Sequence, residues 1–147
     1  MSPFSFSDAL QGVLAQRLAR KLCGVCRTSR PLRPAERQAL SEEYCDGTPL
    51  DPARIRADWS ERFSAGPLLY SAPGCEACGE SGYDGHVGLF EFLSASLLVR
   101  RLIRQRRPLE ELAAGAMREG MRTLRQDGIE KALAGASDLL EIRAPTV

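Results

Sequence analysis

Four cysteines in two C-x-x-C pairs are the residues of this chain best spaced for chemistry: Cys23 with Cys26, and Cys75 with Cys78. Each pair brings two thiolates to one side of a tight turn. Glycine stands within or beside both pairs, where the turn needs backbone conformations that larger residues resist. Four thiolates with two-residue gaps are typical of tetrahedral Zn²⁺ with no coordination position left open. The sequence therefore predicts one structural zinc ion held by these four cysteines.

Residues 27–74 separate the two pairs, a gap longer than the roughly 15–20 residues of compact zinc ribbons. We therefore expect a folded insert between the two halves of the site. Cys45 stands alone in this insert and is expected to be a free or half-buried thiol, and His86 is not expected to replace a cysteine ligand. A redox pair or two disulfides are the alternatives. The presence of two pairs and the lack of a secretory signal pattern favour the metal.

The chain of 147 residues has the composition of a soluble globular protein, with 44% hydrophobic and 27% charged residues and a net charge of +1. That charge gives no global reason to expect nucleic acid as a partner, and no apolar run approaches the roughly 18 residues of a membrane span. Lys21 and Lys131 are the only lysines, and neither lies in the Gly-Lys-Ser/Thr pattern of a phosphate-binding loop. We therefore expect no enzyme activity and no catalytic residues in this chain alone.

Apolar spacing and helix start signals predict the elements that position the cysteines. Leu10, Val13, Leu14 and Leu18 fall on one stripe and predict a helix over residues 5–22 that leads into the first pair. The insert is expected to hold two short helices, which begin at Pro34 and at Pro52 after the capping residue Asp51. Two short strands, residues 67–70 and 86–93, are expected to pair across the metal.

From Ser94 onward the pattern is helical, with segments that begin near Leu97, Pro108, Thr123 and Ser137, and close packing is expected at Gly128. The predicted fold class is mainly α, small α+β, with a tetracysteine zinc subdomain that contains a short two-stranded β element. The expected divisions are a helix that leads from an absent core, a tetracysteine subdomain with a helical insert, and a C-terminal helical bundle: residues 1–22, 23–93 and 94–147.

A group of arginines crowds one predicted helix and its exit: Arg100, Arg101, Arg104, Arg106 and Arg107. A solvated helix face is the simplest interpretation of such a group. The alternative is docking on an acidic partner surface, with anionic lipid or nucleic acid as weaker options. No aromatic residues alternate with these arginines, which disfavours stacking on single-stranded nucleic acid.

Three motifs, in order, resemble the family of type II secretion and type IV pilus assembly ATPases. These are Gly12-Val13-Leu14-Ala15-Gln16-Arg17-Leu18 before the first cysteine pair; Gly74-Cys75-x-x-Cys78-Gly79-x-x-Gly82-Tyr83-x-Gly85-x-x-Gly88-Leu89-x-Glu91; and Gly120-Met121-Arg122-Thr123-Leu124-x-x-Asp127-Gly128-x-x-Lys131-x-x-x-Gly135. The chain departs from that family at His86, where arginine is usual, and at residues 137–140, which replace a segment with two threonines.

The resemblance implies the C-terminal zinc-binding region of a hexameric cytoplasmic motor, separated from its nucleotide-binding core. ATP would then be bound only in the parent protein. The expected partners are that core, other copies in a homohexamer, and the inner-membrane platform proteins through which the motor associates peripherally with the bacterial inner membrane. Because the motifs begin where the core should end, we expect an excised segment of a longer protein more than a natural separate module.

An alternative function is a stand-alone zinc-ribbon adaptor that binds nucleic acid or a regulatory partner. The cysteine pairs and the arginines favour it, whereas the near-neutral charge and the lack of stacking residues disfavour it. A thiol oxidoreductase would need exposed cysteines of low pKa, which the glycine-framed turns do not indicate.

Overall fold

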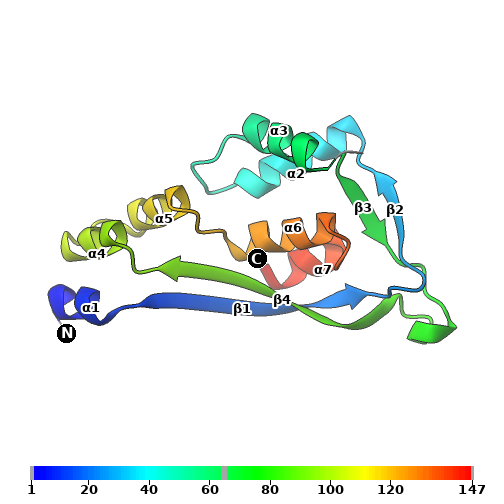
Figure 1. Ribbon diagram of the computed structural model, residues 1–147, viewed down its shortest axis with the longest axis horizontal. Helices are drawn as coiled ribbons and strands as arrows, with labels where there is room; N and C mark the ends of the chain where they lie inside the picture. Colours follow the sequence, from blue (N-terminus) through cyan, green and yellow to red (C-terminus); the bar gives the residue numbers. More distant parts are fainter. Residues whose placement is uncertain (1, 64–65, 147) are drawn as a thin grey trace.

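The computed structural model describes residues 2–63 and 66–146, and most of its helices lie on one side of a long, two-stranded ribbon (Figure 1). Strand β1 (Gly12–Leu22) pairs antiparallel with β4 (Tyr83–Ser94), with Gly12 opposite Ser94 at one end and Arg20 opposite His86 near the other. The register shifts between Arg20 and Leu22. Helices α6 (Leu124–Leu133) and α7 (Leu139–Arg143) lie along one side of the ribbon.

The helix predicted over residues 5–22 is wrong for most of its length. Only α1 (Pro3–Ala9) is helical; its N-cap Ser2 accepts a hydrogen bond from the backbone N–H of Phe4. Residues 12–22 form β1 instead, because this segment pairs with β4 along nearly its whole length. Such tertiary pairing overrides local propensity. The stripe that suggested a helix is also compatible with a strand, since Leu14 and Leu18 have the same parity and share one face.

A second antiparallel ribbon lies next to the cysteines and forms the base of the insert, residues 27–74. Strand β2 (Thr28–Pro31) pairs with β3 (Leu68–Ser71), in a register that sets Thr28 opposite Ser71. Both predicted strands therefore exist, but the expected pairing of residues 67–70 with residues 86–93 is wrong. Strand β3 pairs instead with β2, which follows the first cysteine pair, and β4 pairs with β1, which precedes it.

The two helices predicted for the insert are confirmed as α2 (Pro34–Cys45) and α3 (Pro52–Arg62). Proline occupies the first helical position of both, where a missing N–H costs nothing. The carboxylate of Asp51 accepts from the N–H of Ala53, which is the capping contact predicted from the sequence. Local signals thus determined where these helices begin.

Helix α6 belongs to both hydrophobic cores that form among the described residues. On one side, Ile129 and Leu133 pack with the insert, against a group of buried residues from the insert and its ribbon: Leu32, Leu40, Tyr44, Cys45 and Trp59. On the other side, Ala132 packs with Ala19 and Leu89 of the long ribbon and with Ile142 of α7. The insert is therefore joined to the long ribbon through α6.

The remaining C-terminal helices follow the predicted order: α4 (Leu97–Arg104), α5 (Leu109–Arg118), α6 and α7, followed by a 3₁₀ turn, η2 (Ala144–Thr146). The expected close packing at Gly128 is confirmed, because a Cβ there would lie 2.3 Å from Cγ2 of Ile142. The cap of α7 is Asp138 rather than Ser137. Residues 144–146 form the 3₁₀ turn η2, and Val147 lies outside the described residues.

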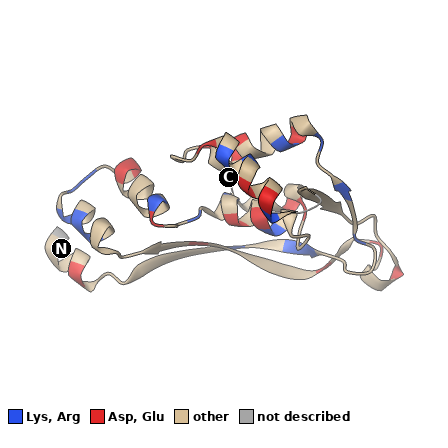
Figure 2. Ribbon diagram, turned by 45° about the horizontal axis from the view of Figure 1, so that its top comes forward, with Lys and Arg blue, Asp and Glu red and all other residues tan. Residues whose placement is uncertain are grey.

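The fold class is confirmed: the described residues form a small α+β protein with seven α-helices, two two-stranded sheets and a four-cysteine cluster. Acidic and basic residues are interspersed along α2, α3, α6 and α7 (Figure 2). One carboxylate connects three of these helices: Glu43 of α2 accepts hydrogen bonds from Arg125 of α6 and from Arg143 of α7.

Because of Glu43, the free energy of unfolding is expected to decrease at acid pH. The hydrogen bond from Arg143 lowers the pKa of Glu43, and the hydrogen bond from Arg125 lowers it further, whereas burial of the carboxyl raises it. A carboxyl whose pKa is lower in the folded state stabilises the fold above its unfolded pKa of about 4.3, and this contribution disappears as the pH falls through the folded pKa. We expect Glu43→Gln to lower the free energy of unfolding by about 1–2 kcal/mol at neutral pH.

Urea denaturation of wild type and Glu43→Gln at neutral and at acid pH measures this effect. The difference between the two proteins should narrow at acid pH, because the wild-type carboxyl is then protonated as well. The matched control is Glu42→Gln, since within residues 2–63 and 66–146 the Glu42 carboxylate accepts a hydrogen bond from Gln38 alone. A difference that stays constant with pH would contradict the role given to Glu43.

Candidate metal centre

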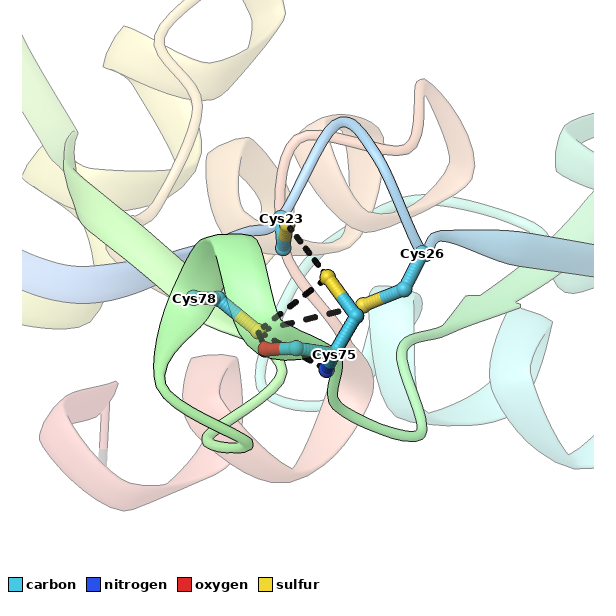
Figure 3. Close-up of side chains that lie close together, drawn as sticks. All are labelled: Cys23, Cys26, Cys75 and Cys78. Atoms are coloured by element: carbon cyan, nitrogen blue, oxygen red, sulfur yellow. Dashed lines mark hydrogen bonds between the residues drawn. The ribbon is translucent and has the colours of Figure 1, made fainter.

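The two cysteine pairs meet where the long ribbon ends and the second ribbon begins (Figure 3). Cys23 follows β1 directly, and Cys26 lies two residues before β2. Cys75 caps the start of the 3₁₀ turn η1 (Glu76–Cys78), and Cys78 is the last residue of this turn, which precedes β4. The four sulfur atoms lie within 4.8 Å of one another, and they form the cluster of metal-binding side chains found among the described residues. The predicted ligands are therefore brought together.

The spacing of the sulfur atoms fits a tetrahedral ion. Sγ of Cys75 lies 4.0 Å from Sγ of Cys23 and 3.8 Å from Sγ of Cys78, and the Sγ atoms of Cys26 and Cys78 are 4.0 Å apart. A tetrahedron with metal–sulfur bonds of about 2.3 Å has edges of about 3.8 Å. No disulfide forms among these cysteines, all of which are free thiols.

Backbone N–H groups point at one sulfur in particular. Sγ of Cys78 accepts hydrogen bonds from the backbone N–H groups of Cys75 at 3.3 Å and of Gly82 at 3.2 Å. Burial would raise the pKa of the Cys78 thiol, but these two donors and the neighbouring thiols Cys75 and Cys26 lower it to about 6. Burial raises the pKa of Cys26 to about 12. The two backbone donors thus favour the thiolate form of Cys78, and the remaining thiols would lose their protons when a cation binds.

Two glycines are required for this geometry. Gly74 and Gly82 have φ angles of +103° and +81°, a region that residues with a side chain rarely adopt. A Cβ at Gly74 would lie 2.4 Å from the carbonyl oxygen of Glu80, and a Cβ at Gly82 would lie 2.4 Å from that of Ala72. Any larger residue would therefore push the second cysteine pair out of place.

The centre is tied to the rest of the protein by contacts that sequence reasoning did not find. The N–H of Cys23 donates to the carbonyl of Gly82, which joins the two cysteine pairs directly. The guanidinium of Arg27 donates to the carbonyl of Gly135, at the end of α6, and lies over the ring of Tyr70. Arg27 is one of many arginines in the sequence, and nothing in its local pattern distinguishes it.

The other candidate residues lie outside the cluster. Cys45 is buried in the insert core at the end of α2, as a free thiol, and His86 is exposed on β4. Neither belongs to the group of four sulfur atoms.

Three of the five clustered arginines have partners within the protein. Arg100 donates to the backbone carbonyls of Ser7 and Asp8, and Arg104 binds the hydroxyl of Ser7 and the carboxylate of Asp8. These two arginines fasten α1 to α4. Arg107 pairs with Glu111 one turn later. Arg101 and Arg106 make no side-chain hydrogen bond or ion pair within residues 2–63 and 66–146.

Comparison with known proteins identifies relatives. A family model described as "Type II/IV secretion system protein" matches residues 1–144. The type IV pilus assembly ATPase PilB of Thermus thermophilus is 36% identical over 148 residues, which cover 100% of this chain and 15% of that protein. Type II secretion system protein E of Dickeya dadantii is 36% identical over 143 residues, 97% of this chain and 24% of that protein.

A further relative, the type IV pilus assembly ATPase TfpB of Acinetobacter baylyi, is 30% identical over 142 residues, 97% of this chain and 21% of that protein. The chain thus spans between 15% and 24% of the length of these three relatives. Among the described residues, no helix is long and apolar enough to cross a membrane.

Proposed function

This chain belongs to the type II/IV secretion system protein family, and on that premise we propose that it is a zinc-binding structural and docking module of a secretion or pilus-assembly ATPase. The match over residues 1–144 carries the proposal, since it includes both cysteine pairs. We assign the module to the C-terminal side of the nucleotide-binding core because its motifs resemble the segment that follows the core in this family. In the parent, a cytoplasmic homohexamer attached peripherally to the inner membrane, it contacts the core and the platform proteins.

Zinc is the metal proposed for the centre. Four thiolates in a tetrahedral arrangement suit this ion, and a site without an open position has a structural role. When bound, the ion supplies cross-links between chain segments and no reaction step. Cys23 and Cys26 would hold it from the end of β1, and Cys75 and Cys78 from the start of the turn before β4. The residues between the pairs would thereby be fixed at both ends.

We expect the isolated chain to show no ATP turnover, because neither lysine lies in a phosphate-binding loop. Phosphate release from ATP, measured at increasing concentrations of the purified chain, checks this expectation. A matched sample of the Cys75→Ser variant shows whether any residual activity depends on the folded centre. Turnover that increases in proportion to the chain and remains constant through further purification would contradict the proposal.

Substitution of Arg101 or Arg106 tests docking without breaking a contact inside the protein. The other three arginines of the cluster have partners within the chain. We expect Arg101→Glu or Arg106→Glu, in the full-length protein, to weaken binding to the cytoplasmic parts of the platform proteins by about tenfold, an electrostatic effect that salt reduces. The affinity is measured as binding of each variant to platform protein immobilised on a surface.

The control for this experiment is Lys21→Glu, which makes the same charge change on the exposed side of β1, outside the arginine cluster. Zinc content and circular dichroism should be the same in all variants. Equal affinities for wild type, Arg101→Glu and Arg106→Glu would return these arginines to the interpretation as a solvated surface. Binding of DNA or RNA by the wild type, with no platform binding, would favour the adaptor function instead.

A further inference from the structure

The segment that follows α6 holds the chain where it enters the first cysteine pair. The carbonyl of Ala136 accepts a hydrogen bond from the N–H of Leu22 at 3.0 Å. One residue later, the hydroxyl of Ser137 donates to the carbonyl of Arg20 at 2.7 Å. Leu22 is the last residue of β1 and directly precedes Cys23. Two residues beyond α6 therefore fix the entry to the metal centre.

The side chain of Arg27 makes the corresponding contact where the chain leaves this pair. Arg27 directly follows Cys26, and its Nη1 donates to the carbonyl of Gly135 at 2.5 Å. Gly135 is buried, and Arg27 is the hydrogen-bond donor found for its carbonyl in the part of the chain that the structure describes. Carbonyls at the end of a helix lack intrahelical donors and carry partial negative charge, which a guanidinium satisfies in both respects.

The same guanidinium reaches the strand that leads to the second cysteine pair. Its carbon atom lies 5.3 Å from the centroid of the Tyr70 ring, within the range of a cation–π contact. Tyr70 belongs to β3, which precedes Cys75. A Cβ at Gly135 would lie 2.9 Å from the Tyr70 ring and 3.0 Å from Nη1 of Arg27, so these three residues are closely packed. Arg27 thus joins the exit of the first pair, the end of α6 and the approach to the second pair.

We propose that Arg27 is a positioning residue of the metal centre, which holds the first cysteine turn against the end of α6 and thereby slows the loss of bound Zn²⁺. This inference rests on the zinc centre of the proposed function and adds to it a residue that contacts no ligand sulfur through a hydrogen bond. A turn that is already held in place loses less conformational freedom when the ion binds, and such preorganisation increases affinity.

The two ends of the turn differ in what holds them, and this difference makes the role of Arg27 specific. Backbone and hydroxyl contacts from Ala136 and Ser137 fix the entry whether or not Arg27 is present. The exit has the Arg27 side chain and the pairing of Thr28 with Ser71 at the start of β2. Loss of the guanidinium therefore loosens the exit, and Cys26 becomes the ligand that detaches first.

We expect Arg27→Met to release Zn²⁺ about tenfold faster than wild type. Residues that orient metal ligands typically change affinity by about 10–100-fold, and the lower end applies because Arg27 is exposed and acts through the backbone. The rate is measured as transfer of zinc from the purified chain to an excess of a chromogenic chelator. Arg27→Lys should lie between the two, because it keeps a cationic donor for the carbonyl of Gly135.

The matched control is Arg30→Met, which makes the same charge change three residues later, in β2. Arg30 binds the carboxylate of Glu36 in α2 and makes no hydrogen bond to the end of α6 within the described residues. It should release zinc at the wild-type rate. Tyr70→Leu should accelerate release, and its effect should be less than additive with Arg27→Met, because both substitutions remove parts of one contact.

Two further measurements separate this role from a general loss of structure. The thiolate-to-metal absorption of the Co²⁺-loaded chain should be the same in wild type and Arg27→Met, since all four ligands remain. Fluorescence of Trp59, the only tryptophan, should show an unchanged insert core. Equal release rates for wild type and Arg27→Met, or equally fast release from Arg30→Met, would overturn this inference alone. A wild-type chain that binds no zinc would overturn the proposed zinc centre together with it.

Discussion

Cys75→Ser is expected to abolish tight metal binding and to cause a larger loss of stability than any substitution outside the centre. Removal of one thiolate opens a closed site, and structural zinc in small domains contributes apparent binding free energies on the order of 10 kcal/mol. The Sγ atom of Cys75 lies 4.0 Å from that of Cys23 and 3.8 Å from that of Cys78, so Cys75 contacts a thiol of each pair. The thermal unfolding midpoint should fall steeply, and chelator should then have no further effect on the variant.

Elemental analysis should give close to one zinc per wild-type chain and almost none for Cys75→Ser. The matched control is Cys45→Ala, which removes a buried thiol that lies outside the cluster and should leave the zinc content unchanged. Hydrogen exchange should accelerate first in residues 23–33 and 66–82, while the amides of α6 change less because α6 also packs against the long ribbon. A variant that stays as stable as wild type, or a fully folded wild type without metal, would disprove the structural role.

Trp59→Ala is expected to lower the free energy of unfolding by about 3–5 kcal/mol, the usual cost of a large cavity in a core. Trp59 is the only tryptophan and is completely buried. The centroids of the Trp59 and Tyr44 rings lie 5.6 Å apart in a T-shaped arrangement, and the indole N–H donates to the carboxylate of Glu130 on α6. The same carboxylate pairs with Arg62 of α3. The substitution therefore removes the main contact between the insert and α6.

Denaturant unfolding followed by circular dichroism measures this loss. Trp59→Phe is the matched control: it keeps most of the apolar volume but not the N–H donor, and it should cost about 1–3 kcal/mol. Both variants should still bind zinc, because the cysteines lie outside the insert core. If Trp59→Ala unfolds at the same denaturant concentration as wild type, the insert is held by the metal centre and its ribbon rather than by α6.

The parts of the fold that sequence could predict are those fixed by neighbours along the chain. Pro34, Asp51 and Pro52 mark helix starts because caps and first turns depend on a few adjacent residues. The cysteine cluster could be predicted as well, since two-residue gaps already place each pair of thiolates on one side of a turn. The close approach at Gly128 could be expected because glycine within a helix is costly unless packing requires it.

The errors concern partners that are distant in the sequence. Residues 12–22 form a strand because β4 pairs with them, and no local pattern reveals a partner more than sixty residues away. The arginine cluster was interpreted as one surface, whereas Arg100 and Arg104 face inward onto α1. Such contacts depend on which helices meet, and an arginine that binds its own chain has the same sequence pattern as one that faces solvent.

The position of the cysteine pairs determines how the protein would respond to mechanical force. Traction on the two ends of the chain would separate β1 from β4 starting at Gly12 and Ser94, which are neighbours at the far end of the ribbon. With zinc bound, separation of the strands would stop at the cluster, which joins residues 23–26 to residues 75–78. The force would then pass through the metal–sulfur bonds rather than through the residues between the two cysteine pairs. Residues 27–74 would bear no load until a metal–sulfur bond breaks. A pulling experiment should then record a sudden extension of about 160 Å, the length of the freed insert at about 3.3–3.6 Å per residue.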